Sequence, residues 1–184
     1  MGSVVEGVRN AIERRVLVEF ERAVIEPRGS SCHGYIHDAS PELVLVQLLS
    51  DRLDLDGYCI LRVADITRLA LEYPRQVFYG RALSAKAIAG EAPARVDLSS
   101  VAAAFRSIEA SYPLFVVHRE LEDPEVCEVG RLKFCSQESY ALRTISPEAR
   151  WVDDARHYSF PSVTRIDFDG EYENTLALVA GLAG

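Results

Sequence analysis

The chain has 184 residues, of which 48% are hydrophobic and 26% are charged, and its formal net charge is −8 at pH 7. This composition is too apolar for a disordered protein and too often interrupted by charges for a membrane-spanning one, because no apolar run approaches the roughly 20 residues of a transmembrane helix. With no secretory signal, Cys-x-x-Cys pair or disulfide framework, we expect a cytoplasmic globular protein with reduced cysteines and no membrane partner.

The first half of the chain predicts a helix, five short strands and a second helix. Ser3 and Glu6 form a capping-box pattern, in which the serine caps a helix and the glutamate reaches back to it. Alternating apolar residues then predict strands, and a glycine in the second of them suits a bulge or a strong bend. The predicted strands span 16–26, 32–39, 42–50, 57–63 and 67–71. A short bend at 64–65 precedes the last strand, and a helix is expected over 75–86.

The second half repeats this order of elements. Asp97, Ser99 or Ser100 can cap a helix that carries several apolar residues on one side and ends before Pro113. The strands expected after it span 114–122, 128–134, 139–146, 156–160 and 164–168, and a helix follows over 171–181. The stretch "AIAGEAPAR" (87–95) is typical of a linker, so we expect one domain over 1–88 and another over 95–184.

The two halves carry the same pattern, which indicates an internal duplication. "ITRLAL" (66–71) aligns with "VTRIDF" (163–168) at a shift of 97 positions, and the same shift pairs Arg22 with Arg119. In the middle of each half the shift becomes 96, which pairs Gly34 with Gly130. Identical residues are few, but the apolar positions stay in register, as a duplicated core requires.

Five short, bent strands flanked by helices are too few for a sandwich and are typical of a small barrel. The tight turn before the last strand resembles the Sm-like branch of the SH3-like small barrels. "SYPLFVVHRELEDPEVCEVGRL" (111–132) and "SVTRIDFDGEYENTL" (162–176) also resemble an uncharacterised bacterial family of tandem Sm-like proteins. The resemblance implies a mainly β fold with flanking helices, built as two five-stranded Sm-like barrels related by the internal repeat. It implies no particular activity.

The RNA-binding signature of the Sm-like proteins is missing from both halves. That signature consists of an Asn-bearing loop between the second and third strands and an Arg-Gly in the turn before the last strand. The corresponding loops here read "ASPE" and "SQE", and the turns read "VADI" and "FPSV". Arg68 and Arg165 lie just beyond these turns, where a displaced arginine contact is conceivable. We expect no Sm-type uridine site.

No residue pattern predicts a catalytic, cofactor or metal site. His33 and His37 share one face of a predicted strand but would lie about 13 Å apart, too far for one zinc ion without a bulge or helix. Cys127 and Cys135 are also too far apart along their strand to share a metal ion, unless His118 from the neighbouring strand joins just one of them. The acidic turn at 51–57 lacks the spacing of a calcium loop, and no G-x-S-x-G, P-loop or G-x-G-x-x-G motif occurs. The sequence therefore does not favour an enzyme.

The leading hypothesis is a non-enzymatic protein-interaction or scaffold module, which binds an unidentified protein or a second copy of itself at exposed strand edges. The alternative is RNA or DNA binding through a local arginine patch made of Arg22, Arg68, Arg119 and Arg165, together with Arg62. The negative net charge disfavours nucleic acid, because such proteins neutralise phosphates with a basic face. The arginines could instead pair with nearby acids, namely Glu21, Glu72, Glu120 and Asp167. A third hypothesis, from size and charge alone, is an acidic neutralising protein such as a toxin antidote.

Overall fold

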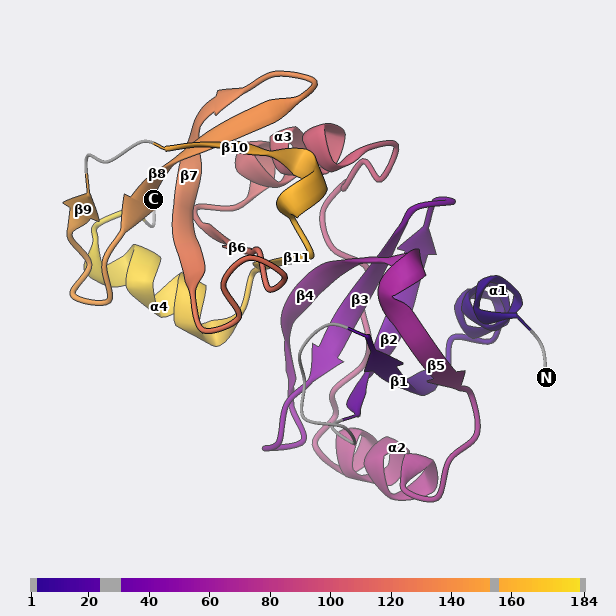
Figure 1. Cartoon of the computed structure of the whole chain (residues 1–184). Coiled ribbons are helices and arrows are strands. Elements are labelled where there is room, and N and C mark those ends of the chain that lie inside the picture. The colour runs from indigo at the N-terminus through magenta and orange to yellow at the C-terminus, as the bar shows by residue number, and fades with distance from the viewer. Residues whose placement is uncertain (1–2, 24–30, 153–155, 183–184) are drawn as a thin grey trace. The chain divides into compact units, whose positions relative to one another are not determined.

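The structure is a computed structural model, and it describes residues 3–23, 31–152 and 156–182. The chain divides into two compact units, Met1–Pro93 and Ala94–Gly184, and this division falls inside the predicted linker. The described residues are mainly β, with eleven strands, four α-helices and two short 3-10 helices (Figure 1). None of these helices is long and apolar enough to cross a membrane.

The first unit has five strands between two helices. Its elements are α1 (Val4–Arg14), β1 (Leu17–Arg22), β2 (Cys32–Ala39), β3 (Leu43–Leu49), β4 (Leu55–Arg62), the 3-10 helix η1 (Val63–Asp65), β5 (Ile66–Ala70) and α2 (Gln76–Ala85). The strands pair in the order β4-β3-β2-β1-β5, and each neighbouring pair is antiparallel. α1 packs against β2 and β5, and α2 packs against β1.

The second unit repeats this arrangement. Its elements are α3 (Val101–Ser111), β6 (Phe115–His118), β7 (Cys127–Cys135), β8 (Ser139–Ile145), β9 (Trp151–Val152), β10 (His157–Ser159), the 3-10 helix η2 (Phe160–Ser162), β11 (Arg165–Phe168) and α4 (Glu171–Val179). The strands pair in the order β10-β8-β7-β6-β11, and β9 also pairs with β8. β9 and β10 together therefore take the position that β4 has in the first unit.

The two units share strand register as well as strand order. Gly34 and Gly130 occupy equivalent positions in β2 and β7, and a Cβ atom at either would lie 2.3 Å from a carbonyl oxygen of the next strand. Each of these strands bulges three residues later, at His37 and at Lys133. A glycine is needed at both positions because the neighbouring backbone approaches too closely for any side chain. The sequence repeat thus corresponds to a repeated backbone geometry.

The first helix of each unit begins at an equivalent serine. The Oγ atoms of Ser3 and Ser100 accept hydrogen bonds from the backbone N–H three residues later, at 3.3 Å and 3.1 Å. Such a cap satisfies one of the N–H groups that the first turn of a helix leaves unpaired. Of the three candidate caps in the second half, Ser100 is the one used, and Asp97 instead accepts from the backbone N–H of Ser99 at 2.9 Å.

The described strands do not form the closed barrels that the sequence suggested. β4 and β5 lie at opposite ends of the first unit's order, as β10 and β11 do in the second, and no pairing between them closes either unit in the described ranges. β1 ends at Arg22, and positions 24–26 of the strand predicted there lie outside the described residues; β6 ends at His118, before the predicted 122. After His118 the chain turns, and the N–H of Glu122 donates to the carbonyl oxygen of Arg119 at 2.8 Å.

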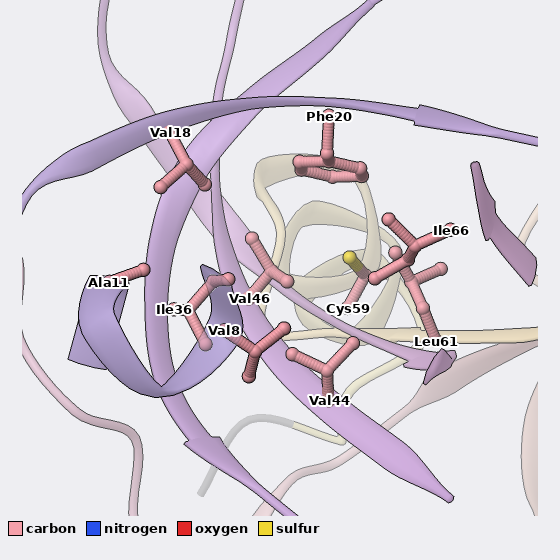
Figure 2. Close-up of a cluster of buried hydrophobic side chains, with 10 residues drawn as sticks. All are labelled: Val8, Ala11, Val18, Phe20, Ile36, Val44, Val46, Cys59, Leu61 and Ile66. Carbon is pink, nitrogen blue, oxygen red and sulfur yellow. The ribbon is translucent and has the colours of Figure 1, made fainter. Parts of the chain in front are cut away.

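The hydrophobic core of the first unit lies between α1 and the strands (Figure 2). α1 contributes Val8 and Ala11, and all five strands supply the remaining side chains. These are Val18, Phe20, Ile36, Val44, Val46, Cys59, Leu61 and Ile66. Full burial of one such aliphatic or aromatic side chain stabilises a fold by about 1.5–3 kcal/mol, so this cluster holds α1 on the sheet.

Candidate interaction surface

The two nominated arginines of the first unit lie on adjacent strands. Arg68, on β5, is opposite Glu21 on β1, and its Nη1 atom is 2.7 Å from Glu19 Oε1 and 2.9 Å from Glu21 Oε1. Its hydrogen bonds to these two carboxylates raise the pKa of Arg68. Arg22 ends β1, opposite Ile66. The charge of Arg68 is therefore already matched by two acids of its own unit.

In the second unit, Arg119 belongs to a partly buried polar cluster. Its Nη1 atom is 2.6 Å from Glu128 Oε2, and its Nε atom is 3.3 Å from Glu122 Oε2. The guanidinium lies 3.6 Å from the centre of the Tyr158 ring, and the Tyr158 hydroxyl donates to Glu128 Oε1 at 3.0 Å. Burial disfavours the guanidinium charge, but the hydrogen bond and the charge of Glu128 outweigh it and raise the pKa of Arg119. Arg119 thus has a well-defined role inside its own unit.

Arg165, on β11, holds a second small network. Its Nε atom is 2.6 Å from Asp167 Oδ1, and the other oxygen of that carboxylate is 3.0 Å from Nε2 of His118. Burial alone would raise the pKa of Asp167, but the Arg165 charge and the bond from His118 together lower it below its ordinary value. The charge of Arg165 is therefore also compensated.

Three of the four nominated arginines are thus ion-paired within their units. Arg68 pairs with Glu21 and Arg165 with Asp167, as the acid-pairing alternative anticipated. Arg119 pairs with Glu128 on the neighbouring strand. The carboxylates beside these guanidinium groups compensate their charge and would repel a phosphate, so the pairs weaken the case for a phosphate-binding patch made of these residues. Nucleic-acid binding by these residues stays a prediction.

The two histidines of β2 have separate surroundings. Nε2 of His33 is 3.4 Å from Glu19 Oε2, and its ring centre lies 4.9 Å from that of Tyr79. Nε2 of His37 is 3.1 Å from Gln47 Oε1. Burial lowers the pKa of both imidazoles, although these partners act in the opposite direction. Within the described ranges no three His, Cys, Asp or Glu side chains are placed so that they could hold a metal ion.

One histidine and one cysteine do meet across a strand pair. The register of β6 and β7 places Cys127 opposite His118. Burial raises the pKa of the Cys127 thiol, and the negative charges of Asp167 and Glu173 raise it further. Because the thiolate is the reactive form, a raised pKa leaves this cysteine a poor nucleophile at neutral pH. The direction of this shift does not favour cysteine catalysis by the pair.

The clearest difference between the units is in the core beside the first helix. Four aromatic residues of the second unit form a cluster there, with the Phe105 ring centre 5.3 Å from Phe115, 4.8 Å from Tyr140 and 5.5 Å from Phe160. At the equivalent positions the first unit has four valines, namely Val8, Val18, Val44 and Val63. Figure 2 shows the first three of these side chains. A valine fills much less space than an aromatic ring, so the first unit is less completely filled here.

A groove in the surface of the first unit lies at this point. It has a volume of about 430 Å³ and is lined by Val5, Val8, Arg9, Ile12, Ala39, Ser40, Pro41 and Val63. α1 forms one wall, and the turn between β2 and β3 together with η1 forms the other. Val5 is 57% exposed, so an apolar wall of the groove faces solvent. We call this feature the α1 groove.

A single charged side chain lines the α1 groove. Its counterpart in the second unit, Arg106, donates to Cys135 Sγ at 3.4 Å and to the carbonyl oxygen of Ser136 at 3.5 Å. Arg9 makes no equivalent bond to Ala39 or Ser40, and no carboxylate in the described part of the chain pairs with it. The α1 groove therefore combines an apolar floor with a guanidinium that is available to a partner.

Neither the α1 groove nor Arg9 was nominated from the sequence. A signal was present, because the shift that aligns the two halves also places Val8 on Phe105 and Val63 on Phe160. These exchanges predict a groove only when it is known that Val8 and Val63 lie close together beside α1. Comparisons with known proteins found no matching family model, no matching curated protein and no matching solved structure.

Proposed function

We propose that this protein is a non-enzymatic protein-interaction module whose α1 groove binds an apolar anchor residue of a partner peptide. The observation that carries the proposal is the groove itself, which is open in the first unit where aromatic rings of the chain fill the equivalent space in the second. Interaction surfaces commonly combine a desolvated apolar pocket with a few polar contacts at its rim.

The chemistry of the α1 groove defines the partner. The anchor is an aromatic or large aliphatic side chain, because Phe105 and Phe160 show which groups this architecture accommodates in the other unit. Arg9 favours an acidic residue close to the anchor, since a guanidinium binds carboxylates through paired hydrogen bonds. Burial of one aromatic anchor contributes about 1.5–3 kcal/mol, or roughly a tenfold to hundredfold gain in affinity.

We also propose that both units belong to the Sm-like class of small barrels. Support comes from two features of each unit. The last strand lies beside the first strand in the sheet, and a 3-10 helix comes directly before the last strand. The outer edge of β5 carries no further strand within the first unit, nor does that of β10 within the second. Such edges offer sites for self-association, which sedimentation of the full chain at rising concentration would detect.

The groove proposal can be tested with a displayed random-peptide library selected on the full chain. Val63→Phe introduces the ring that the second unit has at this position, and it should fill the α1 groove. Selected peptides should share an aromatic or large aliphatic residue near an acid, and Val63→Phe should weaken their binding by about tenfold or more. Arg9→Glu, on an exposed residue, should weaken the same peptides. Val77→Phe is the matched control, because Val77 is 69% exposed on α2, and it should change nothing.

The outcome that overturns the groove proposal is equally definite. Peptides that bind Val63→Phe as tightly as the wild type would place the interaction elsewhere on the molecule. Affinity capture from cell lysate at low salt, with and without nuclease, separates the alternative function. Proteins lost after nuclease treatment, together with enriched RNA or DNA, would favour nucleic-acid binding.

A further inference from the structure

A second hollow lies in the second unit, between α3, β7, β8 and β9. It has a volume of about 460 Å³ and is lined by Glu109, Arg131, Leu132, Lys133, Arg143, Trp151 and Leu182. It is separate from the α1 groove, and its lining is mainly charged. We call this feature the basic hollow.

More cationic than anionic side chains line the basic hollow, in a protein whose net charge is negative. Three cationic side chains and one carboxylate line it, although the net charge of the chain is −8. The carboxylate of Glu109 is already engaged, with Oε1 3.0 Å from Arg131 Nε and Oε2 accepting from the backbone N–H of Leu132 at 2.9 Å. Glu109 therefore compensates one cation and fixes the position of Arg131.

Two of the cations face each other across a strand pair. Arg131 on β7 lies directly opposite Arg143 on β8. Like charges at directly opposite positions destabilise a sheet, whereas an anion held between them turns repulsion into attraction. Arg143 has no carboxylate partner within the described residues. Its guanidinium is instead held 4.4 Å from the centre of the Trp151 ring, which restrains it before any ligand arrives.

This charge is not a requirement of the fold, because the first unit does without it. The equivalent positions there hold Tyr35, His37 and Gln47 in place of the three cations. The segment after α2 is bound at that site, with the N–H of Glu91 donating to Gln47 Oε1 at 3.1 Å. A Cβ atom at Gly90 would lie 2.8 Å from the Tyr35 ring. The segment after α2 thus partly covers this surface in the first unit, where a hollow of about 440 Å³ remains beside Tyr35 and His37 with Arg15 as its one cation, whereas three cations line the hollow of the second unit.

We propose that the basic hollow binds the phosphate group of a small organic phosphate ester, held between Arg131 and Arg143. Arginine side chains bind phosphate oxygens through paired hydrogen bonds of fixed geometry. The volume of about 460 Å³ leaves room for the organic part of the molecule beside Trp151 and Leu182. A phosphate group could also come from a nucleic-acid backbone, so the test separates these sources.

The single tryptophan of the chain is a built-in reporter, because Trp151 lines the basic hollow. Ribose 5-phosphate, inorganic phosphate and a short single-stranded RNA are titrated separately into the full chain at low salt. Tryptophan fluorescence and calorimetry are both recorded. Ribose 5-phosphate should give a saturable signal, and inorganic phosphate should bind more weakly because it lacks the organic part. Ribose 5-phosphate and AMP should compete with each other for one site.

Variants locate the binding. Arg143→Gln should weaken the binding of ribose 5-phosphate by about tenfold or more. Arg143→Lys should weaken it by less, because lysine keeps the positive charge but lacks the planar guanidinium that donates paired hydrogen bonds. Arg81→Gln, which removes the same charge from an exposed position on α2, should leave the affinity unchanged. Equal losses in Arg143→Gln and Arg81→Gln would indicate non-specific attraction and overturn the proposal. Absence of saturable binding up to about 10 mM ester, or binding of RNA alone, would also overturn it.

Discussion

Replacing Gly34 by alanine tests the geometry that the two units share. The added Cβ atom would lie 2.3 Å from the carbonyl oxygen of Gln47 and 2.7 Å from Val46 Cγ1. Gly130 is in the same situation, with the carbonyl oxygen of Arg143 at 2.3 Å. Observed Cβ contacts essentially never fall below 3.0 Å, so the two strands would have to separate. The obstacle is backbone of a neighbouring strand and cannot rotate away.

The cost can be estimated from this overlap. Forcing one extra methyl group into a closely packed site costs about 1–3 kcal/mol, and weakened hydrogen bonds between β2 and β3 add to it. We expect Gly34→Ala to lower the free energy of unfolding by about 2–3 kcal/mol, which corresponds to a fall in Tm of roughly 4–12 °C for a chain of this size. Gly130→Ala should behave alike, because its surroundings are equivalent.

Urea unfolding at 25 °C, followed by circular dichroism, measures the effect. Gly80→Ala is the matched control, since Gly80 lies inside α2 and nothing lies within 4 Å of an added Cβ atom. Alanine there should raise stability by about 0.5–1 kcal/mol, because glycine is a poor helix former. If Gly34→Ala were as stable as the wild type, the close approach of β2 and β3 would be wrong. A loss in Gly80→Ala as large as in Gly34→Ala would show that the assay does not report local packing.

Further predictions concern hydroxyl groups, a helix cap and pH. Tyr73→Phe should leave the free energy of unfolding unchanged or raise it by about 1 kcal/mol, because the buried hydroxyl of Tyr73 has no hydrogen-bond partner in the described structure. Tyr158→Phe should lower the free energy of unfolding by about 1–2 kcal/mol, because it loses the hydrogen bond to Glu128. Ser100→Ala should cost about 1 kcal/mol through the lost cap on α3, and thermal unfolding would compare these variants. Burial lowers the pKa of His33 in the folded state, so the unfolded state binds more protons below about pH 6.5, and stability should fall as pH drops through this window. His33→Gln should reduce that fall, which Tm values of the variant and the wild type from pH 7.5 to 5.5 would show. If both proteins lost the same Tm over this range, His33 would not be the source of the pH dependence.

Features that depend on local sequence were predicted closely. The helices α1 and α3 begin where Ser3 and one of three candidate residues indicated, because a cap acts within one turn of its own helix. Strand identities followed from alternating apolar residues, except that the two-residue strand β9 was not predicted, and the paired Gly34 and Gly130 marked the close strand contact. The positions of the strand ends were predicted less well, since Arg22 and His118 end strands that alternation alone would have continued.

Pairing between distant side chains was decided by the tertiary structure. Glu120 is the neighbour of Arg119 in sequence, yet Arg119 pairs with Glu128 from the adjacent strand. Similarly, Glu72 pairs with Arg14 of α1, at 3.6 Å. Arg119 lies just after β6, and the pairing of β6 with β7 places Glu128 opposite Val117, so the partner of Arg119 comes from another element and not from the next position in the sequence.

The sequence by itself determined that the chain contains two similar units. Each half must bury its own apolar residues, and apolar residues recur in the second half at a shift of 97 positions. Only the tertiary structure decided where the two copies differ in surface. The exchange of aromatic residues for valines is visible in the sequence, but it becomes the α1 groove only where Val8 and Val63 meet beside one helix. Arg131 and Arg143 likewise become one basic hollow because β7 and β8 pair in the register that sets them opposite each other. A surface depends on which residues converge in space, and convergence is a property of packing and strand register.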